Sequence, residues 1–121
     1  MKKSDSKVLV NQIVESIQDK KGQKVIVADL SAIDDTITNY FVICEGRTPN
    51  QVSSLVQNVK DDVKQNAGEF PLSIDGLRNA EWVAMDYADV VVHVFLPEAR
   101  NHYSLETLWA DAQLKSIPDI D

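Results

Sequence analysis

The stretch from Thr48 to Gly68 carries both end signals of an α-helix and a single apolar stripe between them. Thr48 can cap the helix, Pro49 suits the first helical position because its missing N–H has no helical partner there, and Gln51 can reach back to unpaired amides. Apolar side chains then recur at helical spacing, at Val52, Leu55, Val56, Val59 and Val63. The pattern predicts a helix over residues 49–67, ended by Gly68, with one face that must be buried against another layer.

Short apolar and β-branched runs on both sides of this helix predict that the other layer is a sheet. Lys24 to Leu30 and Tyr40 to Glu45 precede it as nearly continuous apolar runs, which are typical of strands covered on both faces. Three further strands are predicted after the helix, at Pro71 to Ile74, Glu81 to Met85 and Val90 to Leu96. Nine residues join the first two strands, too few for a helical crossover, so we expect antiparallel neighbours or an irregular excursion. Four residues join the last two, which fits a hairpin.

Two more helices complete the predicted order of elements. One lies near residues 5–21, where apolar side chains keep helical spacing and Lys20-Lys21-Gly22 supplies a cationic last turn and a stop; the stripe is Val10, Ile13, Val14 and Ile17. The other is indicated by Leu105, Leu108, Trp109 and Ala112, with Pro118 beyond it. The order predicts an α/β fold with a mixed, about five-stranded sheet flanked by helices. We expect a single domain over residues 1–113 and a short, exposed C-terminal tail over 114–121.

Charge is unevenly distributed along the chain. Residues 69–121 carry ten acidic and three basic side chains, and this difference of seven equals the net charge of the whole protein, −7. Direct nucleic-acid binding depends on clustered Lys and Arg, so this half predicts little contact with nucleic acid and favours a basic protein as partner. A charged surface kept for solubility is the plainer alternative.

Membrane and secretion signals are absent from the sequence. No apolar segment approaches the ~18 residues needed to span a bilayer, and Asn11 and Gln12 interrupt the only short apolar run near the start. We therefore expect a cytoplasmic protein without a membrane partner.

The sequence offers few groups for catalysis or metal binding. Cys44 is the single cysteine, so no disulfide framework is possible, and its apolar neighbours predict a buried residue rather than a reactive thiol. His93, His102 and Glu98 lack any fixed spacing for a metal site, and nothing supplies the electropositive setting that a Cys44–His93 nucleophile pair would need.

An acidic group early in the chain keeps one enzyme class open. Asp29, Asp34 and Asp35 could hold magnesium for nucleotidyl transfer, but the glycine-rich turn with a serine that would present the nucleotide phosphates is missing. A solvated acidic loop is the favoured interpretation. We therefore predict no catalytic residues, no metal and no cofactor.

The predicted strand at residues 81–85 places a tryptophan beside a carboxylate. Alternation puts Trp82, Ala84 and Asp86 on one face and Val83 and Met85 on the other. If the valine face is inside, Trp82 points outward next to Asp86, a combination enriched in binding hot spots. Packing of Trp82 under a helix remains the alternative.

The stretch beginning at Asp75-Gly76, DGLRNAEWVAMDYADVVVHVFLPEARNHYSLETLWADA, resembles the ribosomal silencing factor (Iojap-like) family. The features that carry the resemblance are an acidic residue and glycine, a tryptophan strand ending in aspartate, VHVF at 92–95, a lone arginine, a tyrosine, and LE and LW before the end. TNYFVICEGRTPNQVSSL at 38–55 is similar to the family's DYFVI-x-x-G-x-S-x-x-Q-V segment, so that the likeness covers about residues 8–113. Asn39, Thr48 and Ala88 depart from the pattern, and Ala88 leaves the type of the turn at 87–88 open because glycine is usual there.

The resemblance implies a protein without enzymatic activity. Its members bind the large ribosomal subunit through the protein numbered fourteen, block joining of the subunits and repress translation when nutrients are limiting. A nucleotidyltransferase-like core without catalytic motifs is also implied, as is a role in large-subunit maturation. A scaffold for ribosome assembly, and self-association as a homodimer, stay open alternatives.

Four residues are the predicted partner-binding set. Trp82 would be the aromatic anchor, Tyr87 a second aromatic contact, and Asp86 with Asp75 the acidic complements to a basic partner. His93 is expected to be structural, hydrogen-bonded near the C-terminal helix with Tyr103 or Glu106; a place on the rim of the partner-facing surface is its alternative.

Overall fold

The computed structural model describes residues 3–30, 38–103 and 113–119. In chain order the elements are α1 (Lys3–Asp19), β1 (Gln23–Asp29), β2 (Tyr40–Glu45), α2 (Pro49–Ala67), β3 (Ser73–Asp75), β4 (Trp82–Asp86), β5 (Val90–Phe95), α3 (Pro97–Tyr103) and β6 (Gln113–Ile117). The predicted helix over 49–67 is confirmed residue for residue, and so is the predicted strand at Tyr40 to Glu45.

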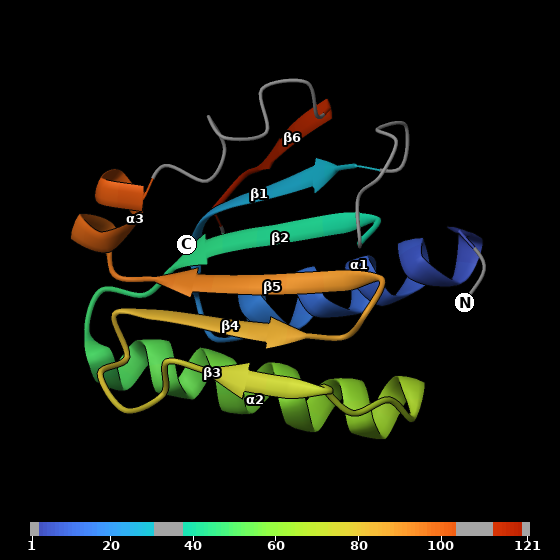
Figure 1. Ribbon diagram of the computed structural model, residues 1–121, viewed down its shortest axis with the longest axis horizontal. Helices are drawn as coiled ribbons and strands as arrows, with labels where there is room; N and C mark the ends of the chain where they lie inside the picture. The colour runs from blue at the N-terminus through green and yellow to red at the C-terminus, as the bar shows by residue number, and fades with distance from the viewer. Residues whose placement is uncertain (1–2, 31–37, 104–112, 120–121) are drawn as a thin grey trace.

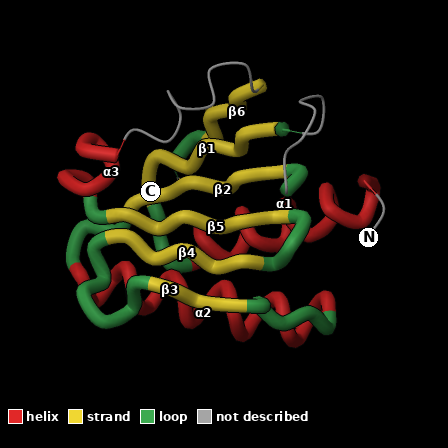
Figure 2. The backbone as a smooth tube through the Cα atoms, in the orientation of Figure 1, coloured by secondary structure: helices red, strands yellow, loops and turns green. Residues whose placement is uncertain are grey.

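The strands form one mixed sheet in the order β3-β4-β5-β2-β1-β6. β2 and β5 are parallel, and every other neighbouring pair is antiparallel. Both long helices, α1 and α2, lie on the same face of this sheet, and the short helix α3 lies at one end of it (Figure 1). The tube view shows the same two layers (Figure 2). The predicted α/β domain with a mixed sheet is confirmed, with six strands instead of about five.

The additional strand corrects the predicted C-terminal tail. Gln113–Ile117 pairs antiparallel with β1 along its whole length, from Val25↔Ile117 to Asp29↔Gln113. Leu114 and Lys115 are exposed as expected, but Ile117 packs against the core. The sequence QLKSI has little apolar alternation of its own; it becomes a strand because the outer edge of β1 offers unpaired backbone groups.

Several predicted boundaries shift. α1 ends at Asp19, so that Lys20 and Lys21 lie beyond the helix rather than in its last turn. Lys21 takes the left-handed conformation there, with φ 60°, instead of Gly22. The helix α3 at Pro97–Tyr103 was not predicted, and the helix predicted from Leu105 to Ala112 lies outside the described residues.

The main core lies between the sheet and the two long helices. The stripes of α1 and α2 pack on the inward side chains of β2, β4 and β5, among them Val42, Val83, Met85 and Val92. Cys44 belongs to this core and is fully buried; burial raises the pKa of its thiol to about 12. The predicted buried cysteine is confirmed, and such a thiol is not nucleophilic at neutral pH.

Both ends of α2 have the predicted chemistry. The Thr48 side chain accepts from the Gln51 amide at 3.1 Å, and the Gln51 side chain accepts from the Arg47 amide at 2.7 Å, one residue before the cap. Gly68 ends the helix at φ 67° and donates its N–H to the Lys64 carbonyl. These contacts fix the limits of the helix that covers one face of the sheet.

Candidate functional site

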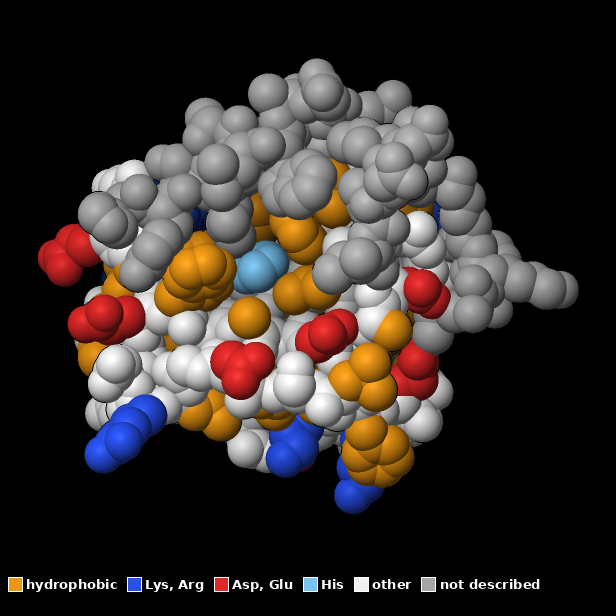
Figure 3. All heavy atoms as spheres, viewed as in Figure 1, with side chains coloured by type: hydrophobic (Ala, Val, Ile, Leu, Met, Phe, Trp, Pro, Cys, Tyr) orange, Lys and Arg blue, Asp and Glu red, His pale blue; other side chains and the backbone are white. Residues whose placement is uncertain are grey.

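The sheet face that points away from α1 and α2 carries a cluster of large side chains. We call it the aromatic face and define it by Phe41, Ile43, Trp82, His93 and Phe95. Strand register brings them together, because His93 pairs with Ile43 on one side and with Ala84 on the other, while Trp82 pairs with Phe95. Ile43 and Phe95 are fully buried beneath Phe41, Trp82 and Ala99 of α3. Figure 3 shows hydrophobic side chains gathered around the histidine on this face, with acidic side chains beside them.

Trp82 lies on the outer side of β4 but packs on its own sheet. The strand shows the predicted alternation: Val83 and Met85 are fully buried in the core, whereas Trp82 is half-buried. Its indole stacks on Phe95 with ring centroids 5.2 Å apart and planes 22° from parallel. Its Nε1–H donates to His93 Nδ1 at 3.0 Å. Trp82 therefore lies on the face that points away from α1 and α2, as predicted, and a second aromatic ring and a hydrogen bond hold the indole in place.

His93 is buried, as the structural interpretation predicts, and it accepts a hydrogen bond from Trp82. The ring is 7% exposed and meets Phe41 edge to face, with centroids 4.9 Å apart. The predicted partners Tyr103 and Glu106 have side chains outside the described residues, so that part of the prediction stays untested. Burial lowers the pKa of His93 to about 4, so the imidazole is neutral at physiological pH.

The neutral state of His93 makes the fold sensitive to acid. Between the unfolded pKa of ~6.5 and the folded pKa of about 4, the unfolded chain binds more protons, so stability present above pH 6.5 is lost as the pH falls toward 4. Going from pH 7.5 to 5.5 is expected to cost ~1.3 kcal/mol through this residue. Urea denaturation of wild type and His93→Gln at both pH values measures the effect, and an equal loss in the two proteins would contradict it.

The two predicted aspartates occupy the same sheet face and differ in availability. Asp75 is exposed on β3, the strand at one end of the sheet, and pairs with Ala84. Asp86 is half-buried, and its Oδ1 accepts from the Ala88 N–H at 2.7 Å. Asp86 thus stabilises the β4–β5 turn, while Asp75 is the acidic group more accessible to a partner.

The β4–β5 turn also shows which backbone conformation Ala88 adopts. The residue adopts φ 70°, the left-handed conformation for which glycine is usual. The turn is closed by the Tyr87 N–H donating to the Val90 carbonyl at 2.8 Å. The hydrogen bond that the Ala88 N–H donates to Asp86 holds a backbone conformation that alanine does not favour by itself, so the turn takes the left-handed conformation without a glycine.

Tyr87 was wrongly predicted as a partner contact. It is 4% exposed and belongs to the helix-covered core. The reason is the period of the strand: Tyr87 continues the series of Val83 and Met85, which points to the helices, and not that of Trp82 and Asp86. Burial raises the pKa of its hydroxyl to about 12, with nearby Glu69 adding to the shift.

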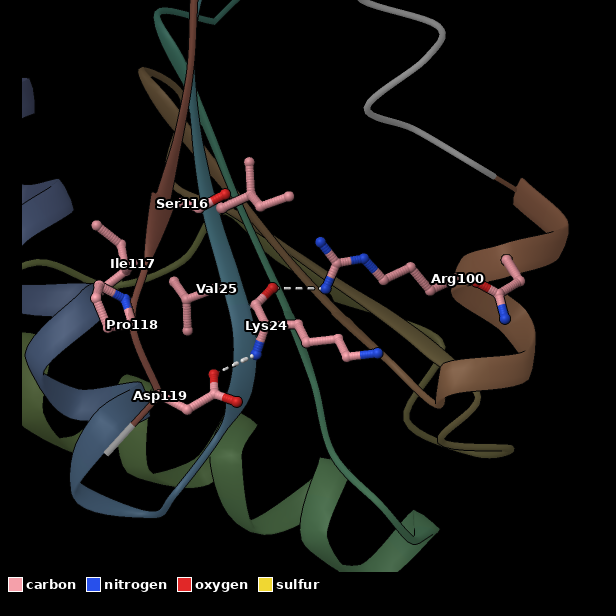
Figure 4. Close-up of a pocket in the computed structure, with 9 residues that line it drawn as sticks. Lys24, Val25, Arg100, Ser116, Ile117, Pro118 and Asp119 are labelled. Atoms are coloured by element: carbon pink, nitrogen blue, oxygen red, sulfur yellow. Dashed lines mark hydrogen bonds between the residues drawn. The ribbon is translucent and has the colours of Figure 1, made fainter. Parts of the chain in front are cut away.

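A buried ion pair at one end of the sheet was missed altogether. Arg100 of α3 lies 3.2 Å from the Glu45 carboxylate at the end of β2, and the two side chains are 6% and 9% exposed. The same Nη1 donates to the Lys24 carbonyl at 2.6 Å, where β1 has an irregular register and Lys24 has φ 51°. The Lys24 N–H points away from Arg100 and donates to the Asp119 carboxylate, which lies beyond β6 (Figure 4). Arg100 therefore ties α3 to the ends of two strands, a role that no local pattern around a single arginine could indicate.

Only one of the three aspartates considered as a magnesium site lies within the described residues. Asp29 ends β1, whereas Asp34 and Asp35 lie outside the described residues. Among residues 3–30, 38–103 and 113–119, no three His, Cys, Asp or Glu side chains come together as a metal site would need. No helix in this described part is long and apolar enough to cross a membrane.

The fold and the site define an α/β domain with one helix-covered sheet face and, on the other, an aromatic cluster beside acidic groups. A family model described as "Ribosomal silencing factor during starvation" matches residues 3–121. The chain belongs to this ribosomal silencing factor family, whose name describes a factor and not an enzyme.

Individual relatives agree with this assignment. Ribosomal silencing factor RsfS of Bacillus subtilis (strain 168) is 32% identical over 113 residues, covering 93% of this chain and 94% of that protein. The mouse protein named "Mitochondrial assembly of ribosomal large subunit protein 1" is 31% identical over 85 residues, 68% of this chain and 36% of that protein. A crystal structure from Chromobacterium violaceum aligns with TM-score 0.81 at 32% identity, covering 86% of this chain and 85% of its own.

Proposed function

We propose that this protein binds the large ribosomal subunit through the protein numbered fourteen and thereby blocks joining of the small subunit, repressing translation when nutrients are limiting. The aromatic face is the binding surface. The observation that carries the proposal is Trp82, which is half-buried on the sheet face opposite both long helices, the face that also carries Asp75 and Asp86. Membership of a family named for silencing ribosomes during starvation supports the process.

The physical basis is steric. A rigid domain seated on the joining surface of one subunit excludes the other, and no bond needs to be made or broken. Trp82 brings a large amphipathic ring whose orientation is already fixed by Phe95 and His93, so little conformational entropy is lost on binding. The acidic excess of residues 69–121 directs encounter with a basic ribosomal protein.

Large-subunit assembly is the second candidate, favoured by one specific finding. The mouse relative carries assembly of the large subunit in its name. Both candidate functions involve the large ribosomal subunit, and the assembly function would act before the subunit is complete. The cytoplasmic location and self-association as a homodimer remain predictions alongside them.

Charge reversal tests the proposed surface. Asp75→Lys is expected to weaken binding to purified large ribosomal subunits about fivefold at low salt, because an attractive charge becomes a repulsive one. Asp61→Lys makes the same change on α2, on an exposed part of the helical layer, and should leave binding within about twofold. Co-sedimentation over a salt series measures both. Equal effects of the two reversals would place the contact elsewhere.

A further inference from the structure

We propose that His93 is a recognition residue, whose Nε2–H donates a hydrogen bond to a neutral carbonyl oxygen that the bound protein presents to the aromatic face. The inference rests on the proposed function, since it names a contact within the same surface. It adds a donor at the centre of a site otherwise described by an aromatic anchor and acidic groups.

The position of the proton follows from the Trp82 contact. An indole nitrogen carries a hydrogen and can only donate, so at 3.0 Å His93 Nδ1 must be the acceptor. A neutral imidazole has one N–H, which therefore lies on Nε2. The ring presents a donor and not a lone pair on the side away from Trp82.

That donor has no hydrogen-bond partner within the protein. Nε2 is buried and unpaired, one of two such side-chain atoms in the described part of the chain. The other, Tyr87 Oη, belongs to the core under the helices, whereas His93 lies on the aromatic face. Buried polar atoms are nearly always paired, so an unpaired donor at this place is explained by a partner that completes it on binding.

The ring is fixed in orientation, so the bound protein has to displace only what covers Nε2, which is buried in the free protein. Phe41 meets it edge to face, with ring planes 84° apart, and Trp82 fixes its rotation through Nδ1. An oriented donor loses little freedom when an acceptor arrives.

The nearby charges define the acceptor. Asp75 and Asp86 share this face of the sheet, so a carboxylate brought to Nε2 would meet like charge. A main-chain carbonyl or the amide oxygen of Asn or Gln avoids this repulsion and can belong to a partner that is otherwise basic. The imidazole needs no protonation to serve it.

Two variants of similar length separate the donor from the shape of the ring. His93→Gln places an amide N–H close to the position of Nε2 and keeps an acceptor oxygen, whereas His93→Met fills similar space with no donor and only a weak sulfur acceptor. With purified large ribosomal subunits as the probe, the glutamine variant is expected to bind about tenfold more tightly than the methionine variant. Thermal denaturation of both confirms that they are compared as folded proteins.

The possible outcomes separate a failure of this inference from a failure of the proposed function. If wild type binds and the two variants bind equally, the hydrogen bond is overturned while the binding function stands. If wild type fails to bind large subunits, the proposed function fails and the inference falls with it. Independently of any partner, imidazole ¹⁵N NMR of the free protein should show the proton on Nε2, and a proton on Nδ1 would overturn the proposal.

Discussion

Replacing Arg100 with methionine is expected to lower the free energy of unfolding by about 3–5 kcal/mol. The substitution leaves the Glu45 carboxylate buried without its counter-charge, and it removes the donor to the Lys24 carbonyl. Both contacts that tie Arg100 of α3 to the ends of β1 and β2 are then absent. Urea denaturation at neutral pH measures the loss, with the midpoint and slope analysed together.

The matched control removes both charges. Arg100→Met combined with Glu45→Leu takes away the stranded carboxylate, and a buried pair replaced by apolar groups is often close to neutral in stability. The double variant should therefore recover a large part of the loss, short of the contribution of the Lys24 contact. A double variant as unstable as the single one would show that the charge of Glu45 is not what makes Arg100 necessary.

Replacing Trp82 with alanine is expected to weaken binding to the large ribosomal subunit by about 2–4 kcal/mol, roughly 30-fold to 1000-fold in dissociation constant. The indole is a large, half-buried side chain of the aromatic face, and its loss also leaves His93 Nδ1 without its donor. Co-sedimentation with isolated large subunits measures the change.

Phe70→Ala is the control for this effect. Phe70 is 61% exposed and lies against Lys64 of α2, with the ammonium 5.8 Å from its ring, so it offers a similar aromatic area next to the helical layer. Its removal should change affinity by less than about twofold. Undiminished binding by a folded Trp82→Ala protein would show that the aromatic face is not the binding surface.

The fold was predictable wherever a segment carries its own signals. The helix at 49–67 has a cap, a proline, a stripe and a glycine, and the structure reproduces its limits. The alternation of β4 correctly separated Trp82 from Val83 and Met85. β6 could not be predicted in this way, because residues 113–117 form a strand through the free edge of β1 and not through a pattern of their own.

The candidate site was predictable in outline and not in its connections. Extending the strand period by one residue would have assigned Tyr87 to the core, so this error was avoidable. The contacts of Trp82 with His93, and of Arg100 with Glu45, join residues 11 and 55 positions apart. Such pairings depend on strand register and on packing between elements, which a single sequence does not reveal.

The most direct test of the central claim is subunit joining in a sucrose gradient. Purified small and large ribosomal subunits are mixed at a magnesium concentration that favours joining, with and without the protein in excess over large subunits. We predict that wild type keeps the subunits apart and migrates with the large one, whereas Trp82→Ala allows joined ribosomes to form. Complete joining in the presence of saturating, folded wild-type protein would contradict the account.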